Sequence, residues 1–234
     1  MIVAVAGGKG GVGKSTTALN LARELDAVVV DADLTTADLP PGTGPDLHDV
    51  LAGRVDPTAA IETIGPVTIL PCGRTLAGAR AAARELENLD AILERIERKW
   101  GTVVVDCPAG LARDVGIELR SADLTILVTT PSKSALVDAF RTASLADSLQ
   151  TPIATLVLNK ADRDAHSEIA DRISRTLGVE VTIIATQQAV ADAQVRWLPV
   201  RDHAADAQAV DAYHSVADRL ERTADRLSDR ATTV

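Results

Sequence analysis

The amino-acid sequence predicts a doubly wound α/β fold, in which helices cover both faces of a mostly parallel sheet of about seven strands. Several short segments are apolar throughout, which is typical of parallel strands buried on both faces. Segments of helical periodicity separate them, and this alternation favours a parallel sheet. The 234 residues contain no internal repeat or linker. We therefore expect a single domain over residues 1–230, with a disordered tail at 231–234.

The apolar pattern and the turn residues place each expected element. Strands are expected at the apolar runs 2–6, 27–33, 67–70, 102–110, 124–130, 153–160 and 179–184. Helices are expected at 14–25, 46–52, 57–61, 84–98, 134–149, 165–177 and from about residue 205 onward. Residues 40–45 are rich in proline and glycine, and therefore predict a loop.

The composition is acidic and poor in aromatic residues. The formal net charge is −9, and aromatic residues make up 2% of the chain. Nucleic-acid binding is therefore not expected, since it depends on surface cations and on aromatic rings that stack on bases. No apolar run approaches the roughly 18 residues of a membrane-spanning helix, and no basic signal segment precedes the first strand. These observations predict a cytoplasmic protein.

The two cysteines, Cys72 and Cys107, are far apart and show no CxxC spacing. This pattern indicates free thiols rather than a disulfide scaffold or a zinc site. Cys107 directly follows the acidic residue Asp106. It is either a small residue packed behind a movable segment or a redox sensor or cluster ligand.

The most informative motif is GKGGVGKS at Gly8–Ser15, called the phosphate loop below. It matches the pattern GxxxxGK[ST], with a predicted strand before it and a predicted helix after it. Glycines allow backbone N–H groups to surround phosphates, and the helix N-terminus adds a favourable dipole. Lys14 is expected to neutralise the β- and γ-phosphates, and the Ser15 hydroxyl to ligate Mg²⁺.

Several motifs in the same order resemble the MinD/ParA family of deviant Walker A ATPases. They are KGGVGKST at Lys9–Thr16, VVVDAD ending at Asp33, VVVDCPAG around Asp106, LVTTPS at Leu127–Ser132 and VLNK at Val157–Lys160. The segment DCPAG followed by LVTTPS is more similar to the MinD branch than to the ParA branch.

This resemblance implies a nucleotide site for ATP with Mg²⁺. The residues that it assigns to nucleotide binding are Gly8, Lys9, Gly10, Gly11, Val12, Gly13, Lys14, Ser15, Thr16 and Asn159. Asn159 is implied to contact adenine, although an asparagine at a strand end also fits an Asx turn. Relatives usually have a proline and an acid after the last strand to frame the base, whereas this chain has IIATQQAV.

The resemblance also implies the catalytic and metal residues. Lys9 and Lys14 are implied to be catalytic, and Lys9 to act across a homodimer on the phosphates of the partner. Asp31 and Asp106, with Ser15, are implied to hold Mg²⁺. Asp33 is implied to position the attacking water. The plainer alternatives are a solvated loop lysine at position 9 and a capping or solvated acid pair at Asp31 and Asp33.

The function implied is a slow ATPase that dimerises with ATP and helps to position a cellular assembly, with an unidentified protein activator or adaptor. One alternative is a non-hydrolysing adaptor that regulates a partner, and a second is a DNA-partitioning ATPase. The C-terminal segment has an apolar stripe and a polar side of mixed charge. A membrane-binding helix requires a cationic polar side. We therefore expect this helix to pack on the core, and membrane recruitment only through a partner.

Overall fold

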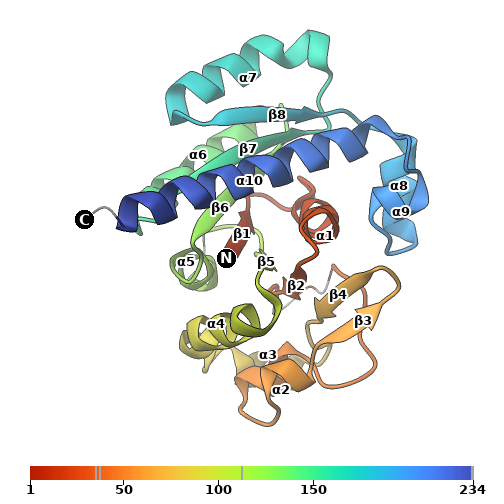
Figure 1. The fold of residues 1–234 in the computed structure, drawn as a ribbon, viewed down its shortest axis with the longest axis vertical. Coiled ribbons are helices and arrows are strands. Elements are labelled where there is room, and N and C mark those ends of the chain that lie inside the picture. The colour runs from red at the N-terminus through yellow and green to blue at the C-terminus, as the bar shows by residue number, and fades with distance from the viewer. Residues whose placement is uncertain (35, 37, 112, 233–234) are drawn as a thin grey trace.

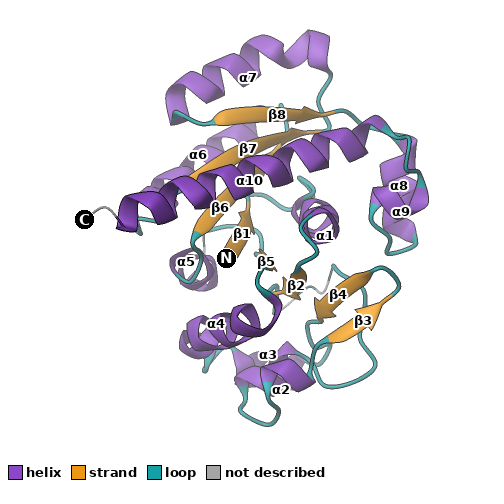
Figure 2. Cartoon of the chain, in the orientation of Figure 1, coloured by secondary structure: helices purple, strands orange, loops and turns teal. Residues whose placement is uncertain are grey.

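The computed structural model describes residues 1–34, 36, 38–111 and 113–232. Its strands form one sheet in the order β3-β4-β2-β5-β1-β6-β7-β8 (Figures 1 and 2). The strand bounds are β1 Ile2–Ala6, β2 Val28–Asp31, β3 Glu62–Ile64, β4 Val67–Leu70, β5 Val103–Asp106, β6 Leu124–Thr129, β7 Ile153–Asn159 and β8 Glu180–Ile184. All neighbouring pairs are parallel except β3 and β4, so the predicted doubly wound α/β class is confirmed.

Helices pack on both faces of this sheet. The longer ones are α1 Lys14–Glu24, α4 Leu89–Trp100, α6 Lys133–Ser148, α7 Arg163–Leu177 and α10 Gln208–Thr232. The shorter ones are α2 Leu47–Leu51, α3 Leu76–Ala82, α5 Arg113–Arg120, α8 Gln188–Val195 and α9 Val200–His203, with the 3₁₀ turns η1 Pro57–Ala59 and η2 Leu86–Asn88. No helix among the described residues is both long and apolar enough to cross a membrane.

The side chains of the central strand β1 show how the two layers arise. Val3 and Val5 belong to the core that also contains apolar residues of α1 and α10. Ile2 and Ala4 belong to the core on the opposite face, beneath α4, α5, α6 and α7. Successive side chains of a strand point to opposite faces, so a strand that is apolar at every position contributes to both cores.

The sheet has eight strands rather than the expected seven. The additional strand β3 pairs antiparallel with β4 across a turn in which Gly65 has a φ of 58°. Its three residues, Glu62–Ile64, are exposed or half-buried, so they lack the apolar run that identifies the other strands. A sequence pattern based on burial misses an edge strand of this kind.

Several element bounds also differ from the prediction. The predicted strands 27–33 and 102–110 end earlier than expected, at Asp31 and Asp106, where the chain leaves the sheet at the carboxyl ends of its parallel strands. The predicted helix 84–98 is a 3₁₀ turn at Leu86–Asn88 followed by α4. The helices α3, α5, α8 and α9 were not predicted, since they are short and lack a long apolar period.

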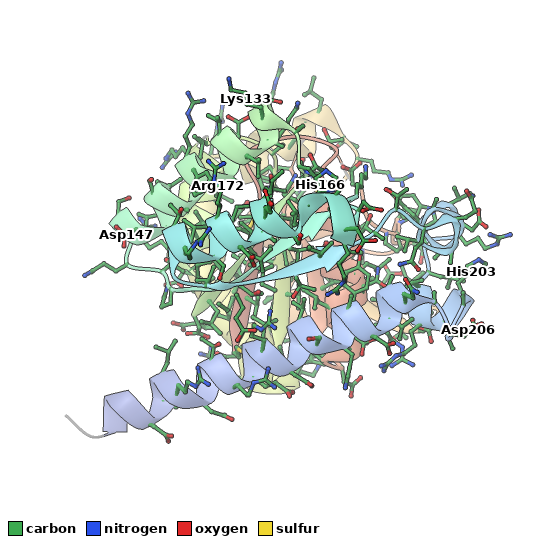
Figure 3. The ribbon with its side chains drawn as sticks, turned by 90° about the horizontal axis from the view of Figure 1, so that it is seen from above. Lys133, Asp147, His166, Arg172, His203 and Asp206 are labelled. Atoms are coloured by element: carbon green, nitrogen blue, oxygen red, sulfur yellow. The ribbon has the colours of Figure 1, made fainter. Side chains whose placement is uncertain are left out.

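The C-terminal helix α10 packs on the core, as expected. Its apolar stripe is buried at Val210, Tyr213, Val216 and Leu220. Arg219 donates hydrogen bonds to the hydroxyl oxygens of Thr155 and Thr182, and forms an ion pair with Glu180. Figures 1 and 3 show α10 crossing the sheet face beside α1, β7 and β8; in Figure 3 Asp206 marks the turn that leads into it.

Candidate nucleotide-binding site

The phosphate loop lies at the carboxyl edge of the sheet, between β1 and α1. Gly13 has a φ of 103°, a conformation that favours glycine, and a Cβ atom there would lie 2.2 Å from Nδ2 of Asn159. At Gly7, just before the loop, a Cβ atom would lie 2.4 Å from the backbone oxygen of Val128. The glycines therefore allow the loop backbone to pack closely against the ends of β6 and β7.

The two lysines of the loop occupy different environments. Lys14 begins α1 and is only 8% exposed. Lys9 is exposed, and its Nζ donates a hydrogen bond to Oγ of Ser134 in α6, at 2.8 Å. The neighbouring Gly10 and Gly11 are also exposed, and a Cβ atom on either would meet nothing within 4 Å. Lys14 therefore belongs to the floor of the site and Lys9 to an open outer surface.

Two residues at the end of β7 hold the loop from the other side. Nδ2 of Asn159 donates to the backbone oxygen of Val12 at 2.8 Å, and Nζ of Lys160 donates to that of Gly11 at 2.9 Å. The structure thus brings Asn159 into the site, with its N–H group directed to the loop backbone. Sequence reasoning missed Lys160, which was recognisable only by its place directly after Asn159.

Asp31 and Asp106 form a buried pair of carboxylates. They end the adjacent strands β2 and β5 and are Cα partners in the parallel ladder. Neither is more than 2% exposed, and Oδ1 of each has no hydrogen-bond partner among the described residues. Burial, together with the charge of Asp106, raises the pKa of Asp31 well above its usual value. Burial also raises the pKa of Asp106 to about 7, although Ser15 and Lys14 act in the opposite direction.

This pair fits a divalent cation. Two buried carboxylates are stabilised when a cation compensates their charge, and carboxylate and hydroxyl oxygens suit Mg²⁺. Within residues 1–34, 36, 38–111 and 113–232, no group of three His, Cys, Asp or Glu residues could hold a metal alone. Mg²⁺ typically takes one or two carboxylates and completes its shell with phosphates and water. Asp31, Asp106 and Ser15 are therefore a suitable set beside a bound nucleotide.

Asp33 follows β2 in a turn at the same edge. Its Oδ1 accepts a hydrogen bond from the backbone N–H of Thr36 at 2.9 Å, and its backbone oxygen accepts one from Sγ of Cys72 at 3.2 Å. The charge of Asp33 contributes to the raised pKa of both Asp31 and Asp106. The structure therefore brings all three predicted acids to one edge, with Asp33 the most accessible of them.

A third buried acid, Glu118, lies behind this edge. Glu118 in α5 is fully buried, and neither of its carboxyl oxygens has a hydrogen-bond partner in the described part of the chain. Burial raises the pKa of Glu118 well above 4.5, more than the neighbouring thiol of Cys107 lowers it. Burial and Glu118 likewise raise the pKa of Cys107 well above its usual value. Cys107 is therefore a neutral thiol inside the core.

A cavity of about 570 Å³ adjoins the phosphate loop. One wall is formed by the loop, Thr16, Asn159 and Lys160. The opposite wall comes from the segment after β8 and from α8, and it comprises Ala185, Thr186, Gln187, Val190, Ala191, Gln194, Val195 and Trp197. Sequence reasoning placed the base beside the segment Ile183–Val190, but it missed the rest of this wall, Ala191, Gln194, Val195 and Trp197, because these residues belong to no motif.

Comparison with known proteins identifies the family to which this site belongs. The model of the CobQ/CobB/MinD/ParA nucleotide-binding domain matches residues 3–200. The chain belongs to this family. An ATP-binding protein of Methanocaldococcus jannaschii is 30% identical over 229 residues, which cover 93% of this chain and 86% of that protein. The septum site-determining protein MinD of Bacillus subtilis is 26% identical over 239 residues, covering 93% of this chain and 88% of the relative.

A solved MinD structure shows the same fold. The Pyrococcus horikoshii septum site-determining protein MinD, complexed with Mg-ADP, has a TM-score of 0.86 and 25% identity, and covers 95% of this chain and 96% of that one. The predicted resemblance to MinD/ParA ATPases is therefore confirmed. The predicted ligands, ATP and Mg²⁺, are confirmed as those of the MinD/ParA family.

Proposed function

We propose that this MinD/ParA-family chain is a single-domain, ATP-dependent switch that dimerises around its nucleotide and hydrolyses it slowly. The observation that carries the proposal is that two lysines of one loop lie in different environments, one buried and one exposed. Lys14 is buried at the base of α1, where it neutralises phosphates bound in its own chain. Lys9 is exposed beside Gly10 and Gly11, where a second copy of the chain can approach the loop.

Lys9 is proposed to act on the nucleotide of the partner subunit. To do so, it must exchange its hydrogen bond with Ser134 for a contact across the dimer. A cation supplied by a second chain stabilises charge on a transferring phosphoryl group and raises the hydrolysis rate by roughly 10³–10⁵. Hydrolysis would then depend on assembly, which is the property that a switch requires.

The carboxylates are proposed to serve metal binding and water positioning. Asp31 and Asp106 are proposed to hold Mg²⁺ together with Ser15, and Mg²⁺ neutralises charge on the phosphates when it is bound. Asp33 is proposed to orient the attacking water, since it is the more accessible acid at this edge. Its hydrogen bond to Thr36 links its position to the conformation of the following segment.

The experiment measures mass and turnover with and without nucleotide. We expect wild-type protein to form a dimer with ATP and Mg²⁺ by light scattering, and to hydrolyse ATP slowly. Asp33→Ala should retain the dimer and lose turnover. Lys9→Ala should bind ATP and remain a monomer, with Lys99→Ala as a control on a distant helix. An Asp33→Ala protein that stays monomeric with saturating ATP would contradict the proposal.

The biological role proposed is positioning of a cellular assembly, such as a division site, a chemoreceptor array or a motility apparatus. It is supported by the similarity to septum site-determining relatives. A non-hydrolysing adaptor is distinguished by the absence of turnover, even when a partner is added. A pull-down from native extract with the Asp33→Ala protein, loaded with ATP, identifies the partner by mass spectrometry. Recovery of duplex DNA alone would favour a partitioning role.

A further inference from the structure

We propose that Trp197 stacks on the nucleotide base and supplies affinity for it, and that Gln194 contacts the edge of that base and selects adenine. The inference rests on the proposed nucleotide-binding function and assigns the part of the site that sequence reasoning left without residues. Both side chains line the 570 Å³ cavity beside the phosphate loop. Both also line the adjoining hollow that contains Ser15 and Thr16.

The position of Trp197 is unusual for a tryptophan. Its φ of 56° lies in the left-handed region, which bulky residues rarely adopt. A turn after α8 holds it there, since its N–H donates to the backbone oxygen of Gln194 at 3.1 Å and the N–H of Leu198 donates to that of Ala193 at 3.0 Å. Trp197 nevertheless remains 37% exposed and lines the cavity. A turn of this kind is the ordinary way in which a helix ends on a left-handed residue, and it fixes Trp197 beside the cavity.

Aromatic residues are scarce in this chain, so an aromatic residue at the cavity is notable. The sequence has four aromatic residues, Trp100, Phe140, Tyr213 and Trp197. Trp197 is the single aromatic residue lining the cavity, within the described part of the chain. Stacking on an aromatic ring raises the affinity for a base by about tenfold or more. The cavity therefore contains one group able to bind a base through its face.

The wall formed by the phosphate loop, Asn159 and Lys160 has fewer side-chain groups available to contact the base. Nδ2 of Asn159 is already engaged with the backbone of Val12. Nζ of Lys160 is likewise engaged with Gly11. These two nitrogens hold the phosphate loop, so this wall offers the base Oδ1 of Asn159, and α8 supplies further groups that recognise the base.

The helix α8 presents one face to the cavity. Gln187, the N-cap of the helix, and Gln194 each lie three or four positions from both Val190 and Ala191, so these four cavity-lining residues lie on one side of the helix. Gln187 accepts a hydrogen bond from the N–H of Ala209. Among the described residues, no hydrogen bond engages the side-chain amide of Gln194.

An unengaged amide at this position discriminates between purines. A glutamine offers one donor and one acceptor side by side, which match N7 and the N6 amino group of adenine. On the same edge guanine offers two acceptors, N7 and O6, so one half of the amide is mismatched. Gln194 therefore favours adenine over guanine, while Trp197 supplies affinity for either base.

The test separates base binding from phosphate binding. The probes are ATP, GTP and inorganic tripolyphosphate, each with Mg²⁺, and binding is measured by calorimetry. We expect Trp197→Ala to weaken ATP binding about tenfold and to leave tripolyphosphate binding unchanged, while Trp197→Phe restores much of the affinity. Gln194→Ala should lower the preference for ATP over GTP by about tenfold.

The chain provides its own optical control. In a Trp100→Phe protein the remaining tryptophan is Trp197, and its fluorescence should change with ATP but not with tripolyphosphate. Equal loss of ATP and tripolyphosphate binding in Trp197→Ala would show a structural role and overturn the inference, as would unchanged ATP binding. If the wild-type protein binds neither ATP nor tripolyphosphate, the proposed function itself is wrong.

Discussion

Nδ2 of Asn159 lies 2.8 Å from the backbone oxygen of Val12, and this hydrogen bond joins the end of β7 to the phosphate loop across 147 residues of chain. Asn159 is 7% exposed, so the bond is protected from water. Its amide nitrogen also occupies the space where a side chain at Gly13 would begin. The asparagine and the glycine therefore determine the shape of the loop together.

Replacing Asn159 by aspartate tests this bond. Asn159→Asp keeps the size of the side chain, removes the donor and places a carboxylate oxygen against the Val12 carbonyl. We expect the free energy of unfolding to fall by about 1–3 kcal/mol, as measured by urea denaturation. Asn88→Asp is the control, because the hydrogen bond that the Asn88 side chain donates, to Glu85, lies on the exposed surface. A variant as stable as wild type would show that the loop does not depend on Asn159.

Two glycines of the loop should respond differently to alanine. Gly13→Ala places a methyl group on Nδ2 of Asn159 and in a left-handed conformation, so we expect loss of nucleotide affinity and a lower melting temperature. Gly10→Ala meets nothing within 4 Å. Its melting temperature should remain within a few degrees of wild type. Calorimetry and thermal melts measure both effects, and equal melting temperatures would contradict the assigned role of Gly13.

The buried acid Glu118 should make stability depend on pH. Its pKa in the folded protein lies well above 4.5, so the folded state holds a proton that the unfolded state releases above that pH. Its contribution to stability is therefore complete below pH 4.5, and it declines as the pH rises toward the folded-state pKa. Glu118→Gln removes this loss. We therefore expect the free energy of unfolding of the variant, relative to that of wild type, to increase by up to about 1.4 kcal/mol per pH unit over that range. The exposed Glu168→Gln change serves as the control, and parallel pH profiles would refute the assignment.

Asp106 should make Mg²⁺ binding depend on pH near neutrality. Its pKa is about 7 in the metal-free protein, and the metal requires the ionised carboxylate. As the pH falls from 8 to 6, Asp106 takes up a proton, and the affinity for Mg-ATP should fall by up to about tenfold per pH unit below 7. Asp106→Asn should bind ATP with similar affinity with and without EDTA, and should lose the part of this pH dependence that Asp106 contributes. Calorimetry of Mg-ATP binding in two buffers that differ in ionisation enthalpy also detects the proton that the wild-type protein releases when it binds the metal.

Arg219 should anchor the C-terminal helix. It connects α10 to Thr155 of β7 and to Thr182 and Glu180 of β8. Arg219→Met removes these contacts while retaining apolar bulk, and we expect a loss of about 1–3 kcal/mol of unfolding free energy. Arg222→Met, on the exposed side of the same helix, should change it by less than about 0.5 kcal/mol. Protection of α10 amides in hydrogen exchange should fall in the first variant alone.

The parts of the fold that were predictable from sequence are those with a strong local pattern. The apolar runs predicted the parallel strands, and the family resemblance implied that Asp31 and Asp106, at the ends of two of them, act together on Mg²⁺. The strand β3 lacks such a pattern, because Glu62–Ile64 pairs on one side and faces solvent.

The wall of the cavity formed by α8 was not predictable for a different reason. Neither Gln194 nor Trp197 belongs to a motif, and both reach the phosphate loop only through tertiary packing. The hydrogen bond from Asn159 to the backbone of Val12 likewise depends on tertiary packing. Its residue type indicated a polar contact at the strand end, while the identity of the partner depended on where the loop lies in three dimensions.

The order of strands has a consequence for synthesis of the protein. β1 is made first, yet Ile2 pairs with Val103 and Val3 pairs with Leu124 on its two sides. Contacts between residues so distant in the chain form slowly, because a long loop must close before they contribute. On the ribosome, β1 therefore cannot pair with strands on both sides, and the phosphate loop cannot be fixed in place, until more than half of the chain has been translated. Until then the nascent chain exposes an apolar, unpaired strand, and surface of this kind is prone to aggregate.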